Sequence, residues 1–249
     1  MVSFGEEAVF SAGMWKSLRR KKPASKVTEE MRAHFATPEG QAELAAYFQT
    51  EEGRAEFARA RWQEVVDRQP TLKEAFAVDV ATYASLMMEP LQVKSGVPLL
   101  KEAIRLAWTS DAFLSVFLYR IRVRLLVHDV PLLPSLLHRL CMILAQMDIG
   151  EAVVIRPGVY FPHGQVVIDG KVEIGTGTVI APWVTLGLNG KDLDGPTLAE
   201  FVFVGTGAKI LGPVQLGRAA WVGANAVVMK DVPAQSTAVG IPARVVRER

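Results

Sequence analysis

The sequence predicts an α+β chain in two parts, an α-helical N-terminal domain over residues 1–147 and a three-walled β-solenoid over residues 148–249. Two observations carry this prediction. Aliphatic residues of the C-terminal part recur every six positions, and the composition changes sharply after Asp148. Before that residue, apolar side chains recur at the three- and four-residue spacing of helices. Beyond it Gly, Val and Ile dominate, and the helical spacing stops.

The N-terminal part contains several signals for helix starts. Two segments, opening at Thr37 and Thr50, each place a threonine before an acidic first turn, as capped helices do. Later helices are expected over residues 71–88, 98–109, 111–128 and 134–147. Asp111 is placed to cap the third of these.

The six-residue repeat is clearest between residues 198 and 232. An aliphatic residue opens each hexad: Leu198, Val204, Ile210, Leu216, Val222 and Val228. A period of six matches neither an α-helix nor a simple strand. It fits a solenoid in which each hexad forms one wall and three walls close a coil. The repeat also runs backward to Ile149, with one extra residue between Phe161 and Ile168, while the polar, glycine-rich residues 187–197 are expected to protrude as a loop.

Composition excludes several classes of protein. The net charge is only +2, and the basic cluster Lys16–Lys26 is interpreted as a solvated segment, so no nucleic-acid partner is expected. The single cysteine, Cys141, rules out an internal disulfide and suits a reducing, cytoplasmic compartment. No secretory signal opens the sequence. The most apolar window, Ala112–Met147, is interrupted by charges too often for a transmembrane segment.

The last coils carry a family resemblance. The segment at residues 202–246 reads VFVGTGAKILGPVQLGRAAWVGANAVVMKDVPAQSTAVGIPARVV. It resembles hexapeptide-repeat acyltransferases, and most closely the serine acetyltransferase branch and its relatives that acetylate sugars or other hydroxyl compounds. The resemblance covers roughly Asp111–Arg244. It implies a left-handed parallel β-helix, acetyl-CoA as the acyl donor, and a homotrimer or a dimer of trimers.

His163 is the predicted general base. Transfer of an acyl group from a thioester to a hydroxyl needs a base, because an alcohol is not ionised at neutral pH, and histidine has a pKa of about 6.5. Of the four histidines, only His163 lies in the solenoid, at the point where the hexad count slips by one residue. His34, His128 and His138 fall on helices and are assigned to caps, surfaces or packing.

A base also needs a carboxylate to orient its ring and stabilise its cation. Asp148 precedes His163 by fifteen residues, a little under one coil. The segment MDIGEAVVIRPGVYFPH matches the serine acetyltransferase segment in which an aspartate and the catalytic histidine have the same separation. Asp148 could instead only cap the junction between helix and solenoid.

The sequence departs from the family where serine is held. The serine-specific form has an aspartate directly before the histidine and an arginine–histidine pair in a later loop, and this chain has Pro162 and Asp194-Gly195. Without those groups the charges of free serine would be poorly paired. The predicted acceptor is therefore a saccharide or another small hydroxyl compound. Asp111 resembles the family's acidic acceptor contact, although it could equally be a helix cap.

The resemblance also implies a donor site in a groove between adjacent subunits of a trimer. Small residues there let the pantetheine arm of coenzyme A approach the backbone, and cations suit its phosphates. The matching positions are Gly187, Gly205, Thr206, Ala224, Lys230 and Arg244. The small residues could also serve tight corners alone.

The main prediction is thus an acetyl-CoA-dependent O-acetyltransferase. The alternatives are a serine O-acetyltransferase proper and a non-catalytic solenoid scaffold. A metal hydratase on the same solenoid needs three histidines, so no metal is expected. Serine acetyltransferases dock a partner sulfhydrylase through a tail ending in isoleucine. This sequence ends in Arg247-Glu248-Arg249, so that complex is not expected.

Overall fold

The computed structural model describes residues 62–87, 99–190 and 194–248. The helices expected near Thr37 and Thr50 and the basic cluster Lys16–Lys26 lie outside these residues. The chain divides into two compact units, Met1–Arg68 and Gln69–Arg249. Of the first unit only the short helical stretch 62–68 is described.

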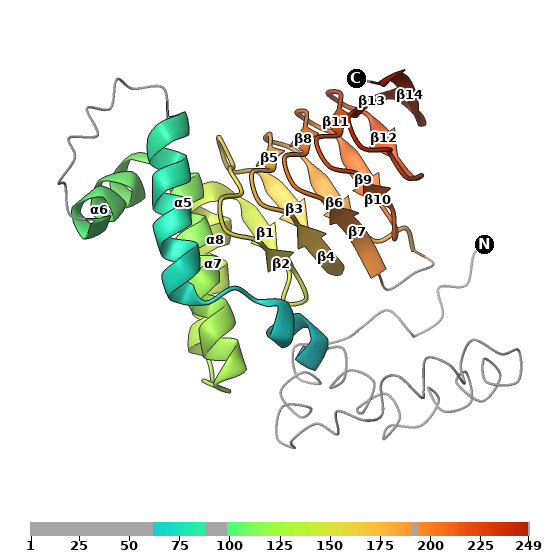
Figure 1. Cartoon of the computed structure of the whole chain (residues 1–249). Coiled ribbons are helices and arrows are strands. Elements are labelled where there is room, and N and C mark those ends of the chain that lie inside the picture. Colours follow the sequence, from blue (N-terminus) through green and yellow to red (C-terminus); the bar gives the residue numbers. More distant parts are fainter. Residues whose placement is uncertain (1–61, 88–98, 191–193, 249) are drawn as a thin grey trace, which may run out of the picture. The chain divides into compact units, whose positions relative to one another are not determined.

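Within its described part, four helices precede the strands (Figure 1): α5 (Leu72–Leu86), α6 (Leu99–Thr109), α7 (Asp111–Val127) and α8 (Leu133–Ala145). They confirm the predicted helices. A capping box of Thr71 and Glu74 begins α5. The cap of α7 is Ser110, whose hydroxyl accepts a hydrogen bond from the N–H of Phe113 at 3.1 Å. The prediction that Asp111 caps this helix was therefore wrong, and Asp111 is its first helical residue.

The strands form three sheets, which are the walls of the solenoid (Figure 1). The first holds β1 (Met147–Ile149), β3 (Val166–Ile168), β6 (Thr185–Gly187), β9 (Lys209–Leu211) and β12 (Val227–Val228). The second holds β2 (Val154–Ile155), β4 (Lys171–Ile174), β7 (Asp194–Leu198) and β10 (Gln215–Leu216). The third holds β5 (Val179–Ile180), β8 (Phe203–Val204), β11 (Trp221–Val222), β13 (Ser236–Gly240) and β14 (Ala243–Glu248). All pairings are parallel except the closing β13–β14 hairpin.

The hexads stack as predicted. Val204 pairs with Val222, and Ile210 pairs with Val228, so equivalent hexads of successive coils lie side by side. Every residue that opens a hexad from Ile149 to Val228 is at most 2% exposed. The six-residue spacing therefore marks the side chains that fill the interior of the solenoid.

The helices and the solenoid share one hydrophobic core. Tyr83 of α5 and Phe113 of α7 belong to the same buried cluster as the hexad residues. Helix α8 ends at Ala145 and β1 begins at Met147, where the composition changes. The division into two domains at residue 147 stays a prediction.

The segment 187–197 was expected to protrude as a loop, but part of it belongs to the solenoid. The chain rejoins the solenoid at Asp194, where β7 pairs with β4 and β10. Gly195 is buried, and a Cβ atom there would lie 2.6 Å from Cγ2 of Val172. Its glycine therefore serves close packing on the neighbouring coil rather than a loop.

A buried ion pair fastens the helices to the first coil. Nε of Arg120 in α7 lies 3.0 Å from Oδ2 of Asp79 in α5, and both side chains are 5% exposed. The guanidinium also donates to the carbonyl oxygens of Ile155 and Arg156. Oδ1 of Asp79 accepts from the N–H of Gly158 at 2.8 Å. One pair of charges thus holds two helices and the backbone of residues 155–158 together.

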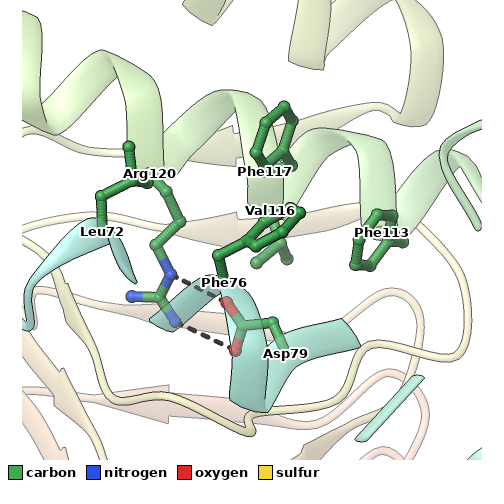
Figure 2. Close-up of a pocket in the computed structure, with 7 residues that line it drawn as sticks. All are labelled: Leu72, Phe76, Asp79, Phe113, Val116, Phe117 and Arg120. Carbon is green, nitrogen blue, oxygen red and sulfur yellow. Dashed lines mark hydrogen bonds and ion pairs between the residues drawn. The ribbon is translucent and has the colours of Figure 1, made fainter. Parts of the chain in front are cut away.

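Figure 2 shows this pair at a small pocket between α5 and α7. The other lining residues are apolar: Leu72, Phe76, Phe113, Val116 and Phe117. Since the two charges already satisfy each other, the pocket offers no unpaired polar group to a ligand. It is a packing feature of the helix junction.

No helix among residues 62–87, 99–190 and 194–248 is long and apolar enough to cross a membrane. The same residues contain no group of three or more His, Cys, Asp or Glu side chains that could hold a metal ion. The thiol of Cys141 is free and buried.

Candidate active site

His163 lies at an exposed bend between Phe161 and β3, where the extra residue of the hexad count is accommodated. The bend packs tightly against the junction of α8 and β1. A Cβ atom at Gly164 would overlap the carbonyl oxygen of Ala145, so only glycine fits. The N–H of Gln165 donates to that same carbonyl at 2.8 Å. The backbone directly after His163 is therefore fixed, although the side chain of His163 is exposed.

Later coils turn at the same corner, and their backbones are connected along it. The N–H of Trp183 donates to the carbonyl of Gln165 at 2.7 Å, and that of Asn225 donates to the carbonyl of Thr206 at 2.8 Å. Gly205, Thr206 and Ala224 all belong to these turns. The structure thus brings three predicted donor-site residues onto the edge that carries His163.

The two candidate glycines differ in what requires them. A Cβ atom at Gly205 would lie 2.7 Å from the backbone nitrogen of Ala224, so the neighbouring coil excludes a side chain there. At Gly187 the nearest atom would be the carbonyl oxygen of Asp169 at 3.8 Å, an ordinary contact. Packing within the chain therefore explains the glycine at 205 but not the one at 187.

The remaining predicted residues lie apart from that edge. Lys230 follows β12, and Arg244 lies on β14, both exposed. Asp111 is exposed in the first turn of α7. No hydrogen bond or ion pair of the described residues joins Asp111 to His163 or Asp148.

Asp148 lies on β1, where its partner on the next coil is Val167. Its Oδ1 atom is 3.5 Å from Nε2 of His138 in α8. No hydrogen bond or ion pair of the described residues joins Asp148 to His163, so that dyad stays a prediction. The assignment of His138 to a cap, surface or packing role missed this contact. Sequence spacing held no signal for it, because the contact depends on how α8 turns into β1.

Arg122 of α7 completes a charged cluster at this junction. Its Nη1 atom lies 3.1 Å from Nδ1 of His138 and 2.5 Å from the carbonyl oxygen of Ile149. Its Nη2 atom lies 3.8 Å from Oε1 of Glu151. Burial lowers the pKa of Arg122, which Glu151 partly offsets. Burial and the charge of Arg122 likewise lower the pKa of His138, against the opposing effect of Asp148 and Glu151.

Tyr83 of α5 fixes the chain directly before His163. Its Oη atom accepts a hydrogen bond from the N–H of Phe161 at 3.2 Å, and its ring lies 4.9 Å from the ring of Tyr160 between centroids. Burial raises the pKa of the Tyr83 hydroxyl. The first helix of this unit therefore contacts the segment that leads into the bend.

Replacing Tyr83 with phenylalanine is expected to lower the free energy of unfolding by about 1–3 kcal/mol, because the N–H of Phe161 would be left buried without a partner. Tyr119→Phe is the matched control. Oη of Tyr119 donates to the carbonyl of Val153 at 2.7 Å, but that carbonyl also accepts from Gln69 at 2.8 Å. Urea denaturation should show the smaller loss for Tyr119→Phe, and equal losses would contradict this account.

Comparisons with known proteins establish the family. The serine acetyltransferase of Bacillus pumilus is 32% identical over 152 residues, which cover 60% of this chain and 70% of that protein. The chain belongs to the serine acetyltransferase family. The serine acetyltransferase of Synechococcus elongatus is 35% identical over 152 residues, but the match spans only 62% of that protein. No protein-family profile matches the chain.

Solved structures of this family share the fold. A serine acetyltransferase in complex with CoA is 29% identical, with a TM-score of 0.59 over 76% of this chain and 75% of that one. The soybean serine acetyltransferase complexed with serine is 25% identical, with a TM-score of 0.60 over 94% of this chain and 98% of that one. These likenesses confirm a helical part followed by a left-handed parallel β-helix.

Proposed function

We propose that this chain is an acetyl-CoA-dependent O-acetyltransferase with His163 as its general base. One observation carries the proposal. In a member of the serine acetyltransferase family, the exposed His163 lies on the same edge of the solenoid as Gly205, Thr206 and Ala224. A base beside small residues, of which Thr206 and Ala224 are exposed, suits acyl transfer from a thioester.

In the proposed reaction, the imidazole of His163 takes the proton of the acceptor hydroxyl as its oxygen attacks the thioester carbonyl carbon. The carbon–sulfur bond then breaks, the thiolate of CoA leaves, and the proton on His163 passes to it. The products are an acetyl ester and free CoA. Asp148 stabilises the imidazolium that forms in between.

The donor is proposed to lie along this edge, in a groove between subunits of a homotrimer or a dimer of trimers. Exposed Thr206 and Ala224 leave the backbone open to the pantetheine arm. Gly187, whose Cβ position is not filled by the chain, would allow a second close approach. Lys230 and Arg244 lie apart from this edge within one chain, and they are the proposed partners of the phosphates where the groove extends beyond it.

Serine is the first acceptor to test. The relatives are named serine acetyltransferases, and one solved relative holds serine. A second candidate, a hydroxyl compound without a free carboxylate such as a saccharide, is favoured by Pro162 and by the buried Gly195. Neither residue offers a charge to an amino acid, and the packing of Val172 leaves no room for a larger side chain at Gly195.

The test is an acceptor panel with acetyl-CoA, followed by mass spectrometry. The panel contains L-serine, which has a free carboxylate, and L-serine amide and a set of monosaccharides, which have none. Fastest acetylation of L-serine supports the first acceptor, whereas faster acetylation of the amide or a sugar supports the second. Acetyl-CoA binding without turnover of any acceptor would contradict the proposed catalytic function and favour a non-catalytic scaffold.

A further inference from the structure

Arg122, His138 and Glu151 lie around Asp148 at the junction of α7, α8 and β1, and they have no part in the proposed reaction. We infer that His138 is a positioning residue of the site, which holds the Asp148 carboxylate through its Nε2–H while Arg122 sets its tautomer. This inference rests on the proposed function, because Asp148 matters to the rate only if it assists His163.

The contacts of Arg122 decide where the imidazole proton lies. A guanidinium has only donors and stays protonated near neutral pH. Nη1 of Arg122 lies 3.1 Å from Nδ1 of His138. Because Nη1 can only donate, Nδ1 of His138 must accept with its lone pair. The proton of the neutral ring is then on Nε2. Nε2 is the atom that faces Oδ1 of Asp148 at 3.5 Å. In the inferred arrangement, donation therefore runs in one direction, from Arg122 to His138 and from His138 toward Asp148.

The same guanidinium fixes the strand on which Asp148 lies. Nη1 of Arg122 is 2.5 Å from the carbonyl oxygen of Ile149, the residue after Asp148, and the Arg122 side chain is 7% exposed. Nε of Arg122 has no hydrogen-bond partner among the described residues, so the contacts of Nη1 and Nη2 orient the guanidinium. One buried side chain thus places both the imidazole and the backbone beside the carboxylate.

Burial and the charge of Arg122 favour the neutral form of the His138 ring. Arg122, Asp148 and Glu151 are the charged groups whose fields act on it. Burial and Arg122 lower the pKa of His138, and the two carboxylates oppose this with smaller effects. A neutral ring can donate to Asp148 without adding a positive charge that would compete with the imidazolium of His163 for the same carboxylate.

The contact leaves room for the proposed dyad. It uses Oδ1, and no hydrogen bond or ion pair in the described part of the chain uses Oδ2 of Asp148. A carboxylate accepts several hydrogen bonds. Asp148 can therefore be held by His138 through one oxygen while the other serves His163.

Two substitutions of His138 distinguish the loss of its Nε2–H donor from the loss of its side-chain volume. His138→Gln places an amide nitrogen near the position of Nε2, whereas the shorter side chain of His138→Asn reaches only as far as Nδ1. We expect the Asn variant to lower kcat by about tenfold with an unchanged KM for acetyl-CoA. The Gln variant should retain kcat to within about twofold, because a donor still faces Asp148. Both variants should fold, since the side chain of His138 is 30% exposed.

A packing role would lower kcat equally in the two variants, and that result would overturn the inference, as would a change in KM alone. His163→Ala, measured in parallel, keeps this failure distinct from failure of the proposed function. If His163→Ala is inactive while both His138 variants match the wild type, only the role of His138 is wrong. If His163→Ala retains turnover, the proposed base itself is wrong.

Discussion

Replacement of His163 with alanine is expected to lower kcat for acetyl transfer by about 10²–10⁴-fold, the range lost with a general base. The acceptor hydroxyl then has no group to take its proton as it attacks the thioester. The fold should be little affected, because His163 is exposed and makes no hydrogen bond or ion pair with other described residues. Steady-state CoA release and thermal unfolding on the same preparation measure both effects.

His128→Ala is the control for this substitution. His128 is also exposed, but it is the C-terminal cap of α7 and lies outside the solenoid. Its removal should leave kcat close to the wild-type value. A His163→Ala protein that turns over as fast as His128→Ala would exclude His163 as the base.

Replacement of Arg120 with alanine is expected to cost about 3–5 kcal/mol of stability, because Asp79 would remain buried as an unpaired charge. The carbonyl groups of Ile155 and Arg156 would lose a donor as well. For a unit of this size the melting temperature should fall by about 10 °C. Urea denaturation and calorimetry measure the loss.

Two comparisons show whether burial is the cause. Arg105→Ala removes an ion pair with Glu102 in which the side chains are 31% and 20% exposed, and it should cost only about 0.5 kcal/mol. The double substitution Arg120→Met with Asp79→Leu leaves no charge buried alone. It should therefore cost less than Arg120→Ala. Similar losses for Arg120→Ala and Arg105→Ala would contradict a stabilising role for the buried pair.

The fold was predictable because the solenoid repeats one requirement. Each wall turns one aliphatic residue inward, so the six-residue spacing marks the core from Ile149 to Val228. The errors arose where a local sequence signal allowed two structural interpretations. Ser110 and Asp111 are both good caps, and the structure uses the first. Glycine at 195 reads as a loop signal, but packing against Val172 requires it.

The candidate site was only partly predictable. Chemistry singled out His163, since no other histidine falls in the solenoid. The contacts of Arg122, His138 and Tyr83 join segments far apart in the sequence, and they depend on how the elements turn. Gln146, for example, takes a left-handed φ of 52° between α8 and β1, which no periodicity reveals. The sequence therefore indicated His163 as the proposed base, but not the side chains that contact its surroundings.

The most direct test of the central claim measures acetylated acceptor and free CoA together in one reaction, using the best acceptor of the panel. Wild-type protein and His163→Ala are compared at equal concentration. We expect the wild type to form the two products in equal amounts, and the variant to form neither above the uncatalysed background. Equal product from both proteins, or CoA release without an acetylated acceptor, would contradict acetyl transfer by His163.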